Sequence, residues 1–188
     1  MHETKENERE KDVKAIRKIA LDTNCLLDAA DVNSLAHGEI MELLGAEVKG
    51  RIELFVSLHS LSELTKDDPI TMRAREIGSA IHRLPYYPIG AWKDQVGAWN
   101  QLAGSWQDAH RNQQVQNELS SLAKSGNDIR DRGAYIDALL AGMQMFVTSD
   151  RQLVGSGPAT RIEKRFGLRI LSPSEIVSEL RLSIDCTY

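Results

Sequence analysis

Five acidic residues could together hold a metal ion. Two of them end predicted strands, one lies about a helical turn beyond a strand, and two stand at the start of a predicted helix. They are Asp22, Glu63, Asp128, Asp131 and Asp150. Carboxylates held close together repel one another, and their ionised forms need a cation. Oxygen ligands suit Mg²⁺ or Mn²⁺, and no histidine stands at ligand spacing beside these acids to favour zinc. A divalent ion held by acids and water is the usual equipment for cleaving phosphodiester bonds.

Each of these acids also has a local explanation. Asp22 and Asp150 could be turn residues after their strands, and Glu63 stands third after Ser60 in the spacing of a capping box. Asp128 and Asp131 suit a helix N-terminus, where the dipole favours acids. Because five acids at one sheet edge are poorly explained by separate local roles, we interpret them as a metal site.

Polar and basic residues beside the acids could support the same site. A hydroxyl or amide can orient a carboxylate, which is the role we expect for Asn24, Thr148 and Ser149. Arginines could meet backbone phosphates, and solvation at the surface explains them equally well; these are Arg130, Arg132 and Arg151.

Two further acids are expected to be structural or peripheral. Asp137 lies six residues after Asp131, about 600° round a helix, so it should point away from Asp131. Asp28 lies one turn beyond the first strand and is expected to face solvent.

The pattern of apolar residues predicts strands that alternate with helices. Strands are expected at 18–23, 53–58, 145–149 and 168–171, with a short edge strand within 85–89. Helices are expected at 34–49, from 60, at 68–84, over much of 90–124, at 129–141 and at 172–180. Strands joined by helical crossovers form a parallel sheet with helices on both faces. We therefore predict a three-layer α/β/α fold with about five strands, whose carboxyl ends share one edge.

Length and composition predict one domain with an elaboration. The chain has 188 residues and a formal net charge of −4. We expect a charged arm at 1–17, a domain at 18–182 that contains a long helical segment at 66–127, and a tail at 183–188. No long apolar run is present, so we expect a cytoplasmic protein without a membrane partner. Cys25 and Cys186 fit no metal or disulfide spacing and are expected to be reduced thiols.

Three tryptophans recur every seven residues in the helical middle segment, at Trp92, Trp99 and Trp106. This spacing puts their indoles on one face of a helix. Core packing or a subunit interface explains such a stripe and is compatible with a homodimer. Stacking of unpaired bases is the alternative interpretation.

Together these pieces resemble a PIN-domain nuclease. The matching segments are IALDTNCLLDA, SLSELT, NDIRDRGAYIDALLAG, MFVTSD and LRILSPSEIV, in the order typical of the family from about residue 18 to residue 180. The resemblance implies a five-stranded parallel sheet, an acidic pocket for Mg²⁺ or Mn²⁺, and hydrolysis of single-stranded RNA. By position, the family's four acids are Asp22, Glu63, Asp131 and Asp150, and Asp128 matches an extra acid found in part of the family.

On this hypothesis Asp22, Asp131 and Asp150 hold the ion directly, with Asp128 beside them, and Glu63 acts through water. In-line attack would leave a 5′-phosphate and a 3′-hydroxyl. The residues that follow the helix acid, Ala134 to Asp137, depart from the common pattern, which makes Asp137 an alternative third ligand. The spacing back from Gly142 and Asp150 favours Asp131 over Asp137.

Three other functions are compatible with the same sequence. Many small relatives are VapC-type toxins paired with an antitoxin protein, although this chain is longer than those toxins. A non-catalytic PIN-like module could bind RNA or a partner without cleavage. A phosphatase with Asp22 as nucleophile would want a second Asp two residues on, where Asn24 stands.

Overall fold

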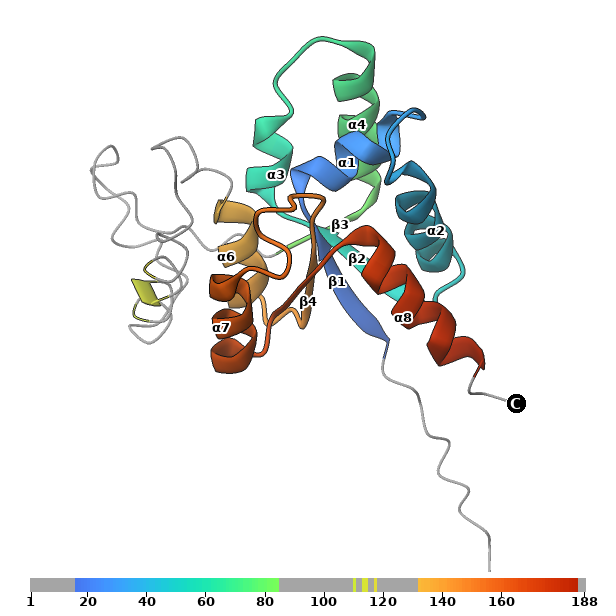
Figure 1. Ribbon diagram of the computed structural model, residues 1–188. Coiled ribbons are helices and arrows are strands. Elements are labelled where there is room, and N and C mark those ends of the chain that lie inside the picture. Colours follow the sequence, from blue (N-terminus) through green and yellow to red (C-terminus); the bar gives the residue numbers. More distant parts are fainter. Residues whose placement is uncertain (1–15, 85–109, 111–112, 115–116, 118–131, 186–188) are drawn as a thin grey trace, which may run out of the picture.

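Five parallel strands form a single sheet in the part of the chain that the computed structural model describes, residues 16–84, 110, 113–114, 117 and 132–185 (Figure 1). The strands are β1 (Arg17–Leu21), β2 (Ile52–Val56), β3 (His82–Arg83), β4 (Met145–Val147) and β5 (Arg169–Leu171). Their order is β3-β2-β1-β4-β5. The predicted α/β class with a parallel sheet of about five strands is therefore confirmed.

The central strand β1 marks the point where the direction of strand addition reverses. It pairs with β2 on one side and with β4 on the other. Open parallel sheets bind ligands in the crevice outside the carboxyl ends of the strands at such a switch point. Residues that follow β1 and β4 are therefore the first place to look for a site.

The described helices cover both faces of this sheet (Figure 1). They are α1 (Thr23–Ala30), α2 (His37–Val48), α3 (Leu58–Glu63), α4 (Pro69–Ala80), α6 (Arg132–Leu140), α7 (Gly157–Phe166) and α8 (Pro173–Asp185). Ile19 and Leu21 of β1 share one apolar cluster with α1, α2, α4 and α8. Ala20, between them, belongs to a second cluster with α6 and α7. This division follows from the alternation of side chains along a strand.

Helix caps end the first two strands earlier than predicted. β1 ends at Leu21 because Asp22 caps α1, a helix that the sequence analysis did not predict. β2 ends at Val56 because Ser57 caps α3, and the Ser57 hydroxyl accepts from the N–H of Ser60 at 2.9 Å. The capping box predicted at 60–63 is therefore wrong, and Glu63 is the last residue of α3.

Other boundaries show how far local signals reach. Asp68 caps α4 with Pro69 at its first turn, as predicted, but this helix ends at Ala80 and does not continue to residue 84. Glu175 and Ser172 cap α8 reciprocally, with the Ser172 N–H 2.7 Å from Glu175 Oε2, as predicted. The helix α7 was missed, although Ser156 caps it and Gly167 ends it in the left-handed conformation.

Several predictions concern residues that the structure does not describe. The Trp92, Trp99 and Trp106 stripe, the edge strand within 85–89 and residues 1–15 of the predicted arm at 1–17 all lie outside the described residues, and Arg17 is already part of β1. The predicted helix at 129–141 is seen from Arg132 to Leu140 as α6, and Gly142 follows with a φ of 71°. No described helix combines the length and apolar character needed to cross a bilayer.

The thiol of Cys25 is buried beneath the end of β4. Its Sγ lies 3.3 Å from the carbonyl oxygen of Val147, and the cysteine is not in a disulfide. Burial raises the pKa of the Cys25 thiol well above its usual value, with a smaller contribution from the charge of Asp22. A buried neutral thiol is a packing group and not a nucleophile.

Candidate active site

Asp22 directly follows the central strand, and two hydrogen bonds hold its carboxylate. Oδ1 accepts from the backbone N–H of Thr23 at 2.8 Å, and Oδ2 accepts from the hydroxyl of Thr148 at 2.7 Å. Thr148 directly follows β4, so this second contact crosses the switch point between β1 and β4. Asp22 is only 9% exposed, and these two donors, both from described residues, help to fix the direction in which its carboxylate faces.

Glu63 is brought to the same place by the residue that follows Asp22. The hydroxyl of Thr23 donates to Oε2 of Glu63, so Thr23 contacts one acid through its backbone and the other through its side chain. Thr23 is not among the site residues that the sequence predicts. The signal that could have found it is a hydroxyl at the first turn of a helix that begins with Asp22 as its cap.

Asp150 joins this network through its backbone. Its N–H donates to the Thr148 hydroxyl at 3.1 Å, and its own Oδ1 accepts from the N–H of Gln152 at 2.8 Å. Asp150 therefore acts as a turn residue after its strand, which is the local explanation that the sequence offered for it. The side chain of Asp150 is exposed at the same edge of the sheet. The hydroxyl of Thr148 thus links Asp22 to the loop that carries Asp150.

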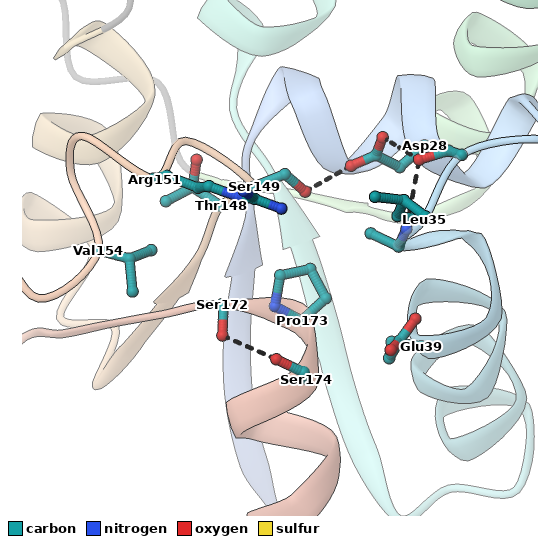
Figure 2. Close-up of a pocket in the computed structure, with 12 residues that line it drawn as sticks. Asp28, Leu35, Glu39, Thr148, Ser149, Arg151, Val154, Ser172, Pro173 and Ser174 are labelled. Atoms are coloured by element: carbon teal, nitrogen blue, oxygen red, sulfur yellow. Dashed lines mark hydrogen bonds between the residues drawn. The ribbon is translucent and has the colours of Figure 1, made fainter.

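A pocket of about 480 Å³ opens at this edge between α2, α8 and the loop after β4 (Figure 2). Asp28 lies in its wall and accepts hydrogen bonds from Ser34 at 2.6 Å and from Ser149. The expectation that Asp28 faces solvent is therefore wrong, because two hydroxyls hold its half-buried carboxylate. Ser149 supports Asp28, and Arg151 also lines the pocket (Figure 2).

Part of the predicted site lies outside the described residues, namely Asp128, Arg130 and Asp131, together with the side chain of Arg132. The side chain of Asn24 is exposed on α1. Within the described residues, no three His, Cys, Asp or Glu side chains converge as metal ligands. The carboxylates of Asp22 and Glu63 carry oxygen atoms, which are the ligand type that a hard cation prefers. A metal site here would need further acids, such as those expected at 128 and 131, which lie outside the described residues.

No protein-family model matches the chain, and a search of curated proteins finds no significant match. Its function therefore has to be argued from the geometry of the site.

A histidine–aspartate pair lies beside Glu63, and the sequence analysis missed it. Nδ1 of His59 in α3 lies 2.8 Å from Oδ2 of Asp137 in α6. Of the two roles expected for Asp137, structural or peripheral, the buried contact agrees with the structural one, since its side chain is only 2% exposed. No local signal could have found this contact, because it joins residues 78 positions apart. The two helices that carry the pair pack against each other.

The protonated form of His59 is favoured in the folded protein. Its hydrogen bond to Asp137 raises its pKa above the usual value of 6.5, burial opposes this, and the charges of Asp137 and Glu63 add to the increase. A group whose pKa is raised by folding stabilises the fold at low pH, and this contribution is lost as the pH rises through the folded pKa.

We therefore expect His59→Gln to cost stability at low pH and progressively less above about pH 6.5. Urea unfolding of both proteins across a series of pH values measures this difference in the free energy of unfolding. The exposed His82, on the edge strand β3, provides a matched control as His82→Gln. A difference for His59→Gln that grows with pH would contradict the assignment.

Proposed function

We propose that the chain is a divalent-metal-dependent endoribonuclease that hydrolyses phosphodiester bonds of single-stranded RNA. The observation that carries the proposal is the hydrogen-bond network of Asp22, Thr23, Glu63 and Thr148 at the switch point of the sheet. It holds two carboxylates at the edge where parallel sheets bind ligands. The resemblance of the sequence to PIN-domain nucleases supports the same chemistry and adds Asp131 and Asp150 to the acids.

In this proposal each residue of the site has a separate role in holding the ion, the water or a carboxylate. A bound Mg²⁺ or Mn²⁺ supplies an activated water and neutralises charge that develops on the phosphate. Asp22, Asp131 and Asp150 would hold the ion, and Glu63 would orient the attacking water. The Thr148 and Thr23 hydroxyls would keep the carboxylates of Asp22 and Glu63 in place. Acid groups that are oriented before the substrate arrives need little reorganisation during the reaction.

The proposal is tested by incubating the purified full chain with mixed single-stranded RNAs in Mg²⁺, in Mn²⁺ and in EDTA. We expect cleavage in at least one metal, none in EDTA, and products that carry 5′-phosphates. RNA that stays intact in both metals would refute the proposal. Cleavage in EDTA would refute the metal dependence.

Removing the Thr148 hydroxyl should slow the reaction without removing an acid. Thr148→Val keeps the shape of a fully buried side chain but deletes the donor to Asp22 and the acceptor for the Asp150 N–H. Loss of such an orienting partner typically costs about 10- to 100-fold in activity or metal affinity. We expect a decrease of that size in kcat/KM for RNA cleavage.

Two further threonine variants make this measurement specific. Thr148→Ser retains the hydroxyl and should restore most of the activity. Thr160→Val removes an exposed hydroxyl in α7 that donates to the carbonyl oxygen of Ser156, the residue that caps this helix, and should leave the rate unchanged. Equal rates for wild type and Thr148→Val would show that the hydroxyl does not support the reaction.

A further inference from the structure

The imidazole of His59 is fixed in one position by contacts on two sides. Its Nδ1 lies 2.8 Å from Oδ2 of Asp137. Its ring lies against the backbone of Gly133 so closely that a Cβ added there would be 2.5 Å from the ring Cγ. Any larger residue at 133 would displace the ring. Both contacts therefore come from the first two turns of α6, where Gly133 packs against the ring and Asp137 supplies the carboxylate.

The buried carboxylate of Asp137 favours a positive charge on that ring. Its Oδ1 is buried and has no hydrogen-bond partner within the described part of the chain. A buried carboxylate that is only partly hydrogen-bonded is costly unless a cation lies beside it. The charged groups that face His59 in the described structure are Asp137 from α6 and Glu63 from α3, and both are acids. The surroundings thus stabilise an imidazolium.

This imidazolium is accessible from the side of the acids. The His59 side chain is 35% exposed, and it lines a pocket of about 390 Å³ together with Ser62, Glu63 and Thr65. Glu63 is the acid that Thr23 links to Asp22. A group that enters this pocket therefore meets the imidazole of His59 and the hydroxyls of Ser62 and Thr65, with the carboxylate of Glu63 in the same wall.

We propose that His59 binds a phosphate group of the RNA strand as an imidazolium, and that Asp137 positions it for this contact. An acidic site repels a polyanion, and a charge-assisted hydrogen bond from a seated cation offsets that repulsion. The inference rests on the proposed ribonuclease function, since it names the substrate strand as the ligand. It assigns His59 to substrate binding and Asp137 to positioning, and neither is one of the acids expected to hold the metal.

The test measures RNA binding in the absence of metal and cleavage. Fluorescence anisotropy of a short labelled oligouridylate in EDTA gives the Kd for wild type and for His59→Gln. We expect about tenfold weaker binding by the variant, since a hydrogen bond to a charged group is lost. The slope of log K against log salt should fall by about 0.7, as one phosphate contact on a single strand is removed.

The pH dependence separates a binding role from a structural one. Wild-type affinity should fall as the pH rises above about 6.5 and the imidazolium loses its proton, whereas the affinity of His59→Gln should stay nearly level. Asp137→Asn keeps the shape of the seat but removes its charge, and it should move this loss of affinity to lower pH. Thermal melting shows whether each variant is folded, and His82→Gln should bind as the wild type does.

Failure of this inference is distinguishable from failure of the proposed function. A wild type that cleaves RNA, with a folded His59→Gln of equal affinity, salt slope and pH profile, overturns the role of His59 alone. A wild type that does not bind the oligouridylate in EDTA also overturns it. A wild type that binds through His59 but cleaves no RNA in either metal overturns the nuclease function and retains the phosphate contact.

Discussion

Asp22→Asn should lower the rate of metal-dependent RNA cleavage by at least about a hundredfold, since even the loss of an orienting neighbour costs up to that much. The substitution keeps the size of the side chain and removes the charge that would bind the cation. Asparagine also caps helices well, so its Oδ1 can still accept from the Thr23 N–H. Single-turnover cleavage of a labelled RNA in Mn²⁺ measures the effect.

The fold of this variant is expected to survive, which makes its rate interpretable. In the wild type the Thr148 hydroxyl donates to Oδ2 of Asp22. In the variant the side-chain amide at position 22 can instead donate to that hydroxyl. Glu163→Gln is the matched control, because it removes one exposed negative charge beside Arg169, the first residue of β5, at the opposite edge of the sheet. Asp22→Asn that cleaves as fast as the control would refute the assignment of Asp22.

Much of this fold could be predicted because its strongest signals are local. The apolar runs that form β1 and β4 are buried on both faces, and such runs are typical of parallel strands. The caps at Asp68 and Ser172 also act within a few residues of themselves. Signals of this kind are present in the sequence before any tertiary contact forms.

The boundaries of α1 show where local reasoning failed. The sequence predicts a strand at 18–23 and no helix directly after it, because a short apolar run suits strand and helix alike. The structure ends the strand at Leu21 and begins a helix at Thr23. That change of direction seats Asp28 in the pocket and gives Thr23 its contact with Glu63. Neither placement follows from an extended chain.

The placement of Asp137 depended on tertiary packing. The sequence predicts that Asp137 points away from Asp131, which lies outside the described residues, but it does not tell what Asp137 itself contacts. In the structure Asp137 faces α3, where it contacts His59, and the ring of His59 packs against Gly133. Neither Gly133 nor His59 indicates this contact by itself. The glycine is needed because the ring of His59 occupies the space that a Cβ at 133 would take.

Phe146→Ala should cause the largest loss of stability among single changes near the site, about 3–5 kcal/mol. Phe146 is 1% exposed in β4. Its ring meets that of Tyr135 edge to face, with centroids 5.4 Å apart. Alanine removes this contact and leaves a cavity between the sheet and α6, because a packed interior relaxes only in part. Urea unfolding should show a lower midpoint with an unchanged slope.

Two further variants separate cavity formation from the loss of the aromatic pair. Phe146→Leu keeps most of the apolar volume, so it should cost roughly half as much as alanine, and part of that cost is the edge-to-face contact itself. Val48→Ala shortens a side chain that is 88% exposed at the end of α2 and should change stability by less than about 0.5 kcal/mol. If Phe146→Ala were as mild as Val48→Ala, β4 would not be packed against α6. The position of Thr148, two residues further along, would then lose its structural support.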